Sequence, residues 1–503
     1  MINGEQEPIV IEVMDMEKCF DKLWLEATIN AFYECGINND KLNLIYILNN
    51  KSEVAVKIGN TSSKKTSLVK NVVMQGSVMA SLQCTTLQDS FNRIYEKYPP
   101  LNYFYKNDTN IQIGMLGFVD DTLSIQKCGN LAIEKNAASN SFVDCTNQKK
   151  KEDKTNYIHI GNKKFCKQKC PNLIVNESIM KETSCSKYLG NFISTKNNTN
   201  NIIEARRKKG FSIIPAIESI LDEVNFGSRR IQAALLLQEA CLHSSMLFCA
   251  EVWFPVTIAD ISKLEKVDVY FKRKILKAQV KTPSISLYLE LGCLKLRHVI
   301  LMKRVMYFHC LIKKDINDLT YKILMKQEQD SIKGDFIELI RSDFKYLGLY
   351  YDLNKLRNLC KIEFKAMLKK SIFDVAFKEY LNEKRNMKKL RNINYSKFKL
   401  QSYLQSNHLT NYQKQVIFSL RTYTFKVRMN LRRLHLNNLL CRLCHNRDET
   451  QEHIFTQCSE IEGKILTQEY ISIFRESEIK LDTARCIGKI ANIWNVHLDN
   501  FKE

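Results

Sequence analysis

The first 195 residues alternate between short apolar runs and amphipathic stretches, which is typical of a mixed α and β domain. Residues 9–14, Ile-Val-Ile-Glu-Val-Met, have the composition of a buried strand. Helical spacing of apolar residues covers 23–35, 40–50, 80–97 and 130–144. Strands and hairpins are predicted at 54–59 with 68–73, 116–125, 156–160, around 175–178 and from 187 to 194. This order predicts an α+β fold in which helices cover one face of an antiparallel sheet.

Beyond residue 195 the apolar positions follow helical spacing almost throughout. Helices are predicted at 213–224, 230–251 and 258–279, followed by a helix, turn and helix over 287–297. We therefore expect five regions: a mixed domain at 1–195, a helical region at 196–312, a basic helical region at 313–437, a small metal-binding element at 438–462 and a C-terminal tail at 463–503.

Charge and cysteine content narrow the class of partner. The 503 residues include 76 Lys and Arg against 54 Asp and Glu, a formal net charge of +22, which favours a polyanion and first of all nucleic acid. No apolar run reaches the ~20 residues that span a bilayer, and the polar N-terminus is unlike a secretory signal. We expect no membrane partner and an intracellular protein whose 17 cysteines are reduced, so that clustered cysteines are metal ligands.

Two adjacent carboxylates, Asp120 and Asp121, lie inside the apolar run 116–125. A strand points neighbouring side chains to opposite faces, and an unpaired carboxylate is costly to bury. We therefore expect the pair at the turn of a hairpin, facing a divalent cation; the alternative is an ordinary exposed turn. Asp15 ends the first predicted strand and is either a further metal ligand or a helix N-cap.

Four short motifs occur in the order of a reverse transcriptase palm. They are Asp15-x5-Asp21 with Phe20, Gln75-Gly76, Phe118-Val-Asp-Asp121 and Tyr188-Leu-Gly190. The fuller runs at 15–21 and 74–78 resemble the reverse transcriptases of non-LTR (LINE-type) retrotransposons in particular. A group II intron maturase shares the palm but fits the run at 15–21 less well. The resemblance implies RNA-directed DNA polymerase activity, in which two-metal phosphoryl transfer adds deoxynucleotides to a primer 3′ end.

The resemblance also implies a role for each matching residue. Asp15 and Asp120, with Asp121 as a third acid, would hold two Mg²⁺ or Mn²⁺ ions. Nucleotide binding would fall to Phe20, Gln75, Gly76 and Lys154. Primer support would fall to Tyr188, Leu189 and Gly190. Phe20 would reject a ribose 2′-hydroxyl, or else is a core residue; Lys154, or one of the lysines at 149–151, would neutralise the leaving pyrophosphate.

The chain departs from the family pattern before its first catalytic acid. Only 14 residues precede Asp15, so we expect the fingers region and the endonuclease of complete enzymes to be missing. Gln83 also places a polar group in an otherwise apolar stretch after the second motif. The alternative to a working polymerase is a remnant that binds RNA or DNA through its basic helices and metal element without extending a primer.

Cys441, Cys444, His453 and Cys458 are spaced as Cys-x2-Cys-x8-His-x4-Cys. Three thiolates and one imidazole satisfy tetrahedral Zn²⁺ with no open position, so the site would be structural. The alternatives are His445 as a ligand, or four unrelated reduced side chains. The spacing resembles the CCHC knuckle that follows the polymerase region of LINE-type proteins, which implies nucleic-acid binding. Arginines nearby suit that role: Arg428, Arg432, Arg433, Arg442 and Arg447.

A dense basic cluster precedes this element. Seven cations lie within 16 residues: Lys384, Arg385, Lys388, Lys389, Arg391, Lys397 and Lys399. Tyr395 and Phe398 lie among them and either stack on bases or pack in the core. The implied partners are an RNA template, a DNA primer or duplex, and deoxynucleotides, and the implied location is the nucleus and cytoplasm as a ribonucleoprotein.

Overall fold

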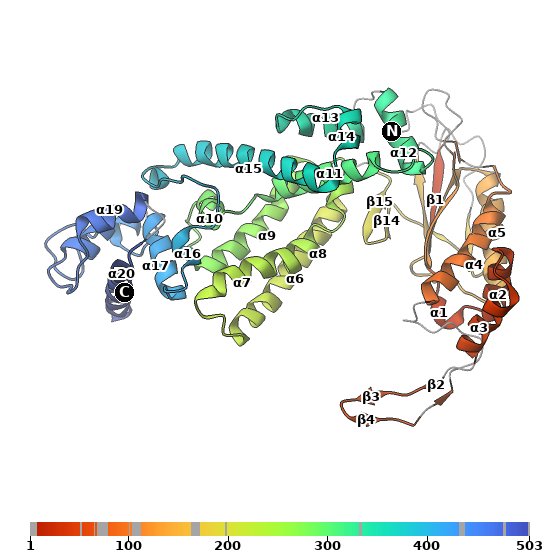
Figure 1. The fold of residues 1–503 in the computed structure, drawn as a ribbon, viewed down its shortest axis with the longest axis horizontal. Helices are drawn as coiled ribbons and strands as arrows, with labels where there is room; N and C mark the ends of the chain where they lie inside the picture. The colour runs from red at the N-terminus through yellow and green to blue at the C-terminus, as the bar shows by residue number, and fades with distance from the viewer. Residues whose placement is uncertain are drawn as a thin grey trace. The chain divides into compact units, whose positions relative to one another are not determined.

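The computed structural model describes residues 8–50, 53–64, 66–67, 79–99, 101–102, 112–161, 172–196, 199–330, 334–431, 438–475 and 479–500. The chain divides into two compact units, residues 1–198 and 199–503. Figure 1 draws the first in red to yellow and the second in yellow-green to blue. The first unit mixes strands and helices, and the second is built from helices.

Twenty regular elements are described in the first unit. Its helices are α1 (Cys19–Lys22), α2 (Leu25–Glu34), α3 (Asn39–Asn50), α4 (Ala80–Tyr95) and α5 (Asn130–Cys145). Its strands are β1 (Ile9–Met14), β2 (Glu53–Val54), β3 (Lys57–Ile58), β4 (Thr61–Ser62), β5 (Thr66–Ser67), β6 (Leu101–Asn102), β7 (Gln112–Ile113), β8 (Met115–Phe118), β9 (Asp121–Lys127), β10 (Asn156–Ile160), β11 (Ile174–Val175), β12 (Ser178–Ile179), β13 (Lys181–Glu182), β14 (Cys185–Tyr188) and β15 (Asn191–Ser194).

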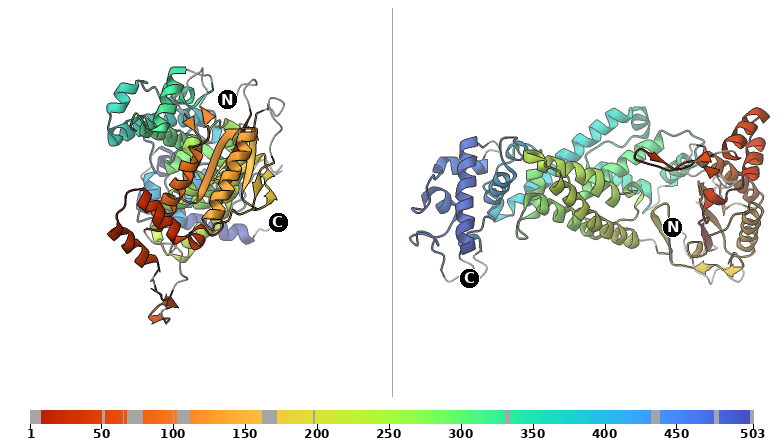
Figure 2. Two further views of the ribbon diagram at one scale, coloured as in Figure 1. Left: turned by 90° about the vertical axis from the view of Figure 1, so that its right-hand side faces the viewer. Right: turned by 90° about the horizontal axis from the view of Figure 1, so that it is seen from below.

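The main sheet has β1 at its centre. Within the described residues its strand order is β13-β10-β1-β9-β8, and Ile11 of β1 lies opposite Ile125 on one side and Ile158 on the other. Helices α4 and α5 lie against one face, as Figure 2 shows in its left view. The other face packs Tyr188 and Ile193 of the β14–β15 hairpin against the sheet. The α+β class is confirmed, but the expectation of a wholly antiparallel sheet is wrong, because β10 and β13 are parallel.

Two predicted hairpins differ in their turns. The first hairpin turns at Gly59 and Asn60, and β4 begins at Thr61. Residues 61–62 of the stretch 60–65, which was expected to be a polar turn, therefore belong to a strand. Residues 68–73 lie outside the described part of the chain. The stretch 187–194 is a hairpin whose turn is Leu189 and Gly190, both with positive φ.

The second unit begins with a long helix and continues as a helical stack. Its helices are α6 (Asn200–Glu223), α7 (Arg230–Leu237), α8 (Ser244–Met246), α9 (Ile258–Leu276), α10 (Ser284–Leu291), α11 (Leu296–Ile312), α12 (Leu319–Asp330), α13 (Phe336–Tyr346), α14 (Leu353–Asn358), α15 (Lys361–Arg385), α16 (Ser402–Gln405), α17 (Asn411–Arg421), α18 (Arg428–Leu431), α19 (Thr467–Arg475) and α20 (Leu481–Asn500). The helix expected at 230–251 is split, because a π-helical turn at Gln238–His243 separates α7 from α8.

One hydrophobic cluster of the second unit extends from Ile231 to Trp494. The stretch expected as a tail forms α19 and α20, and Trp494 is completely buried. Cys441 and Cys458 belong to the same cluster. The finer divisions expected at 312, 437 and 462 stay predictions.

A buried carboxylate, Glu290 of α10, joins distant parts of the second unit. Its oxygens accept hydrogen bonds from Tyr395 Oη (2.7 Å), Tyr403 Oη (3.0 Å) and Arg421 Nε (2.8 Å). Tyr395 is therefore a core residue and does not present its ring to bases. Phe398 also packs inside, among aromatic side chains of α15: Phe373, Phe377 and Tyr380.

A second buried carboxylate, Asp268 of α9, explains the π-helical turn. Both ends of that turn donate to Asp268 Oδ1: Gln238 Nε2 at 2.6 Å and His243 Nε2 at 2.8 Å. Lys272 Nζ (2.7 Å) and Tyr288 Oη (2.9 Å) donate to Oδ2. Burial alone would raise the pKa of Asp268, but Lys272 and His243 hold it well below its ordinary value.

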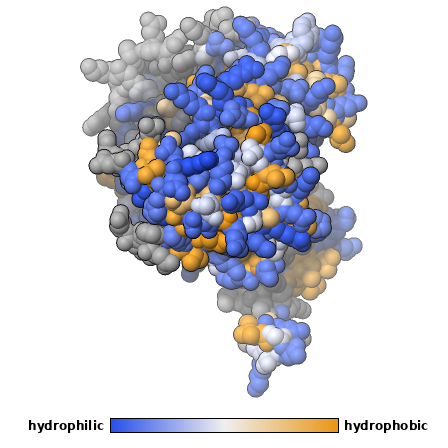
Figure 3. Space-filling view, turned by 90° about the vertical axis from the view of Figure 1, so that its left-hand side faces the viewer, coloured by the Kyte–Doolittle hydropathy of each residue, from blue (hydrophilic) through white to orange (hydrophobic). Residues whose placement is uncertain are grey.

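The surface is largely polar. Figure 3 shows hydrophilic side chains over most of one face, with hydrophobic residues in small separate groups. No helix in the described ranges is long and apolar enough to cross a bilayer.

Gln83 of α4 generates a stability prediction. It is fully buried, and neither amide atom has a hydrogen-bond partner among the described residues. Gln83→Leu nearly conserves volume, so we expect the free energy of unfolding of the first unit to rise by about 1–3 kcal/mol. Hydrogen–deuterium exchange of peptides from this unit measures the change. The matched control Gln88→Leu removes the 2.9 Å bond to Thr122 Oγ1 and should lower stability by about 1 kcal/mol; a loss in both variants would contradict the prediction.

Gly292, the residue after the end of α10, generates a second stability prediction. Its φ is +63°, and an added Cβ would lie 2.2 Å from the backbone carbonyl carbon of Lys399. Gly348 has a similar φ of +65° but open space around it. We expect Gly348→Ala to cost about 1–2 kcal/mol for the left-handed backbone alone, and Gly292→Ala to cost clearly more. Urea unfolding followed by the fluorescence of Trp253 and Trp494 measures both, and equal losses would exclude the steric effect.

Candidate acidic site and Cys3His metal site

The pairing of β1 with β9 determines where Asp15 lies. Met14, the last residue of β1, is opposite Thr122 of β9. Asp15 therefore follows β1 at the end of the sheet where β9 begins with Asp121. The register of a sheet is a property of the whole strand pair. The apolar pattern of β1 and β9 therefore brings Asp15 and Asp121 to one end of the sheet, although the two residues are far apart in sequence.

The turn between β8 and β9 contains Val119 and Asp120, with Phe118 opposite Asp121. The expected hairpin is therefore present, with Asp120 in the turn and Asp121 as the first residue of β9. Val119 has a φ of 58°, which costs about 1–2 kcal/mol for a residue with a Cβ. The strands on either side hold the turn in this conformation.

Lys154 provides the positive charge at this site. Its Nζ lies 2.9 Å from Asp15 Oδ2, and this ion pair raises the pKa of Lys154. Burial and the negative charges of Asp120 and Asp15 raise the pKa of Asp121, which Lys154 opposes. The three acids therefore interact electrostatically, and one of them already has a cationic partner.

Backbone hydrogen bonds hold the segment before β10 alongside the segment after β1. Lys151 N donates to Asp15 O (2.8 Å), and Glu17 N donates to Lys149 O (2.8 Å). Asp15 N donates to Thr155 Oγ1 (3.3 Å). These bonds place the turn that carries Lys154 next to Asp15.

The carboxylates have the right chemistry for Mg²⁺, which prefers oxygen ligands. Among the described residues, Asp15, Asp120 and Asp121 are not a group of side chains drawn together closely enough to hold a metal ion, whereas the four Cys and His side chains near the C-terminus are. Lys154 pairs with Oδ2 of Asp15, and a divalent ion would compete with it for that oxygen.

Of the other residues expected at this site, some lie near the acids, one packs in the core and two are not described. Phe20 is partly buried and packs, as an ordinary core residue would, against the core cluster that includes Met14. Val119 packs against the same cluster. Gln75 and Gly76 lie outside the described residues. Tyr188 is near the acids, since burial and the charge of Asp121 raise its pKa.

The residues that the resemblance assigns to primer support lie at a turn. Tyr188 Oη donates to Leu116 O in β8 (3.4 Å), and Leu189 and Gly190 follow with φ of 47° and 76°. The β14–β15 turn is thus tied to the strand that leads into Asp120.

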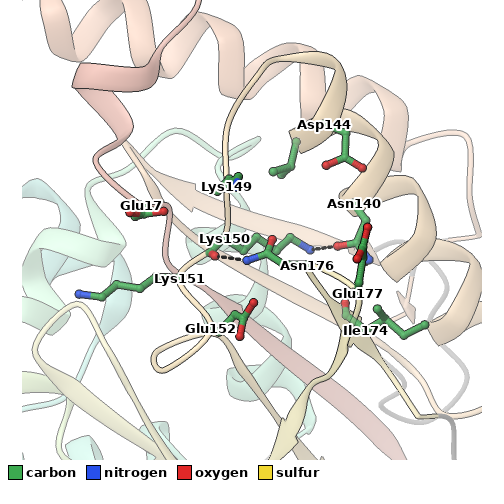
Figure 4. A pocket seen from close by; sticks show the side chains of 11 residues that line it. Glu17, Asn140, Asp144, Lys149, Lys150, Lys151, Glu152, Ile174, Asn176 and Glu177 are labelled. Carbon is green, nitrogen blue, oxygen red and sulfur yellow. Dashed lines mark hydrogen bonds between the residues drawn. The ribbon is translucent and has the colours of Figure 1, made fainter.

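A cavity of about 870 Å³ lies beside residues 149–152, and the acids Asp15, Asp120 and Asp121 do not line it. Figure 4 shows Lys150 crossing it. Lys150 Nζ donates to Asn140 Oδ1 (2.9 Å) and to buried Glu12 Oε1 (3.3 Å), while Asn176 Nδ2 donates to Lys150 O (2.6 Å). These polar groups bond to one another, so this part of the lining is structural.

Cys441, Cys444, His453 and Cys458 come together as the sequence predicts. Their ligand atoms all lie within 4.8 Å of one another. Cys441 Sγ and Cys458 Sγ are 3.9 Å apart, and Cys444 Sγ is 3.2 Å from His453 Nε2. Tetrahedral Zn²⁺ with bonds of about 2.3 Å to sulfur has ligand-to-ligand edges of about 3.8 Å. The group therefore fits a zinc-sized ion.

Local hydrogen bonds form this site. Cys441 N donates to Arg447 O (2.7 Å), and His445 N donates to Cys441 O (2.9 Å). His445 has a φ of 56° and is exposed, so His453, from the π-helical turn His453–Gln457, is the imidazole of the cluster. Burial raises the pKa of Cys441, and that of Cys458 to about 12.

The arginines expected to bind nucleic acid here are partly used inside the fold. Arg442 makes a bidentate ion pair with completely buried Glu449, through Nε (2.8 Å) and Nη2 (2.5 Å), and lies over the Trp494 ring. Arg442 is therefore held inside the fold by Glu449, and its role in nucleic-acid binding stays a prediction. Arg428 Nη1 donates to Leu440 O. Arg432 and Arg433 lie outside the described residues. Nothing in the pattern of residues predicts the role of Glu449, which lies in the spacer between Cys444 and His453.

We expect the purified protein to contain about one zinc ion per chain, since the four ligands leave no open position. Cys441→Ser and His453→Ala should each remove it, as measured by mass spectrometry of bound metal. Cys310→Ser and His445→Ala are the matched controls and should retain it. Zinc retained in His453→Ala and lost in His445→Ala would reverse the ligand assignment.

No model of a known family matches the chain, and no curated protein matches it. Among solved structures, telomerase from Candida albicans, in complex with the TWJ fragment of telomeric RNA, aligns with 13% sequence identity and a TM-score of 0.22. The alignment covers 57% of this chain and 45% of the telomerase chain.

Proposed function

We propose that the chain is an RNA-directed DNA polymerase of the type encoded by non-LTR retrotransposons. The observation that supports this most is the strand register that places Asp15 beside Asp120 and Asp121 at one end of a central sheet. The order of the sequence motifs around these acids supports the same class. The substrates would be an RNA template, a DNA primer and deoxynucleotides.

The acids would hold divalent ions, which supply charge stabilisation for the transferring phosphoryl group and activation of the primer hydroxyl. Asp15 and Asp120 would be the main ligands for Mg²⁺, and Asp121 a third. Lys154, released from Asp15, would neutralise phosphate oxygens of the nucleotide.

The surrounding residues would orient the substrates. Phe20, which packs against the same core cluster as Val119 of the acidic turn, would exclude a ribose 2′-hydroxyl. Gln75 and Gly76 would contact the nucleotide and template. The turn at 188–190, tied to β8 through Leu116, would support the primer end.

A second candidate function is nucleic-acid binding without polymerisation. The ion pair of Asp15 with Lys154 favours it, because this pair is compatible with a site that has no metal. The zinc element and the net charge of +22 serve this function equally well.

Binding of Mn²⁺, measured by electron paramagnetic resonance, separates the two functions. We expect Asp120→Asn to weaken binding at least about tenfold, as loss of a carboxylate ligand does. Lys154→Met should tighten it about two- to fivefold, because an exposed ion pair worth ~0.5–1 kcal/mol no longer competes. Lys149→Met, from the same segment, is the control and should bind like the wild type.

Primer extension on an RNA template with Mn²⁺ or Mg²⁺ completes the test. If the wild type extends the primer and Asp120→Asn does not, the result supports the polymerase proposal. Equal Mn²⁺ binding in the wild type and Asp120→Asn would show that the acids hold no ion, and the second function would stand.

A further inference from the structure

Helix α15 buries a narrow apolar stripe. Residues at every fourth position of this helix are completely buried: Phe364, Leu368, Ile372, Ala376 and Tyr380. The stripe packs against α10 and α11. The opposite side of a 25-residue helix, about 37 Å long at 1.5 Å per residue, is therefore on the surface.

The acidic residues of α15 are mostly used inside the second unit. Glu379 Oε2 accepts from Arg297 Nη2 (2.6 Å), and Glu383 Oε2 accepts from Lys295 Nζ (2.6 Å); both donors belong to the start of α11 or the residue before it. Glu363 closes the capping box at the start of the helix with Cys360. Glu363 and Asp374 are the exposed acids of this helix, which the structure describes throughout, and Asp374 lies four residues from both Lys370 and Lys378.

The basic residues are distributed differently. Five lysines of α15 are exposed, and no ion pair to a described residue is formed by any of them: Lys361, Lys365, Lys369, Lys370 and Lys378. Lys361, Lys365 and Lys369 follow one another at intervals of four residues, and Lys370 adjoins the last. The two acids that pair with the start of α11 or the residue before it, Glu379 and Glu383, thus belong to the C-terminal third of the helix, and four of the exposed lysines belong to its N-terminal half.

This arrangement weakens the helix itself. Like charges four residues apart repel, whereas alternating Glu and Lys would attract. A surface that served only solubility would intersperse both signs. The row formed by Lys361, Lys365 and Lys369, which has no acid at the same four-residue spacing, is instead favourable when a polyanion lies along it and its counter-ions are released.

We infer that the outer face of α15 binds the phosphate backbone of a nucleic-acid strand, through Lys361, Lys365, Lys369, Lys370 and Lys378. A membrane surface fits less well, because a helix that lies on a bilayer inserts its apolar side, and the apolar side of α15 is occupied by the core. Contacts to phosphates position a strand without selecting sequence. The inference concerns the second unit alone and does not depend on the acids of the first.

The test compares two triple variants of the full chain with the same change in net charge. Lys365→Gln/Lys369→Gln/Lys370→Gln removes three cations of this face. Lys322→Gln/Lys480→Gln/Lys489→Gln removes three exposed lysines from α12, the residue before α20 and α20. Fluorescence anisotropy with a labelled single-stranded RNA of mixed sequence, repeated from 50 to 300 mM salt, gives the affinity and its salt dependence.

We expect the α15 variant to bind about tenfold or more weakly at physiological salt, and its slope of log affinity against log salt to fall by about 2. The scattered variant should keep the wild-type slope. Because repulsion within the helix is relieved, the melting temperature of the α15 variant should stay equal or rise, which separates lost binding from lost folding.

Three outcomes would overturn the inference. Equal losses in both variants would show an effect of net charge alone. Unchanged RNA binding in the α15 variant would place the interface elsewhere. Loss of binding to vesicles of anionic lipid, with RNA binding retained, would make the face a membrane contact. Because metal binding by Asp120 is measured separately, none of these outcomes bears on the polymerase proposal.

Discussion

The need to pair buried charges is the constraint on which both units depend. Glu12 is completely buried on the central strand and bonds to Lys150, which fixes the segment that carries Lys154. In the second unit, Asp268 with Lys272 and Glu290 with Arg421 are buried to the same degree. Removing one partner of such a pair leaves an uncompensated charge at a cost of about 3–5 kcal/mol. Glu12 with Lys150 and Glu290 with Arg421 join different segments directly, and Asp268, which pairs with Lys272 on its own helix, reaches α10 through Tyr288.

The sequence predicted the elements whose apolar residues have a clear period. Strand β1 and helices α3, α4 and α5 were expected within a few residues of their observed bounds. The short strand at Thr61 and Ser62 was missed because its polar, exposed residues carry no period of burial. The split of the helix at Gln238–His243 was missed because its cause, Asp268, lies on another helix. Local periodicity contains no information about such a partner.

The two candidate sites differ in the same way. The Cys3His group was predictable because its four ligands lie within 18 residues and their spacing is itself the signal. The acidic site depends on the register between two strands that are far apart in sequence. It was predicted only because the order of the motifs resembles that of a known family. The partner of Asp15 was not predictable, since Lys154 was expected to meet phosphate. Val119 adds a strained backbone at the turn that presents Asp120, and strain of this kind is often found at functional sites.

The complete burial of Trp494 has a consequence for the order in which the protein forms during synthesis. The described elements of the first unit end at residue 194, so that unit can fold while later residues are still being added. The hydrophobic cluster of the second unit begins at Ile231 and is not closed until Trp494 has left the ribosome. Its early helices therefore stay exposed through most of translation, when apolar surface is prone to aggregation. Their many lysines and arginines make this nascent segment more hydrophilic while its apolar side chains are still exposed.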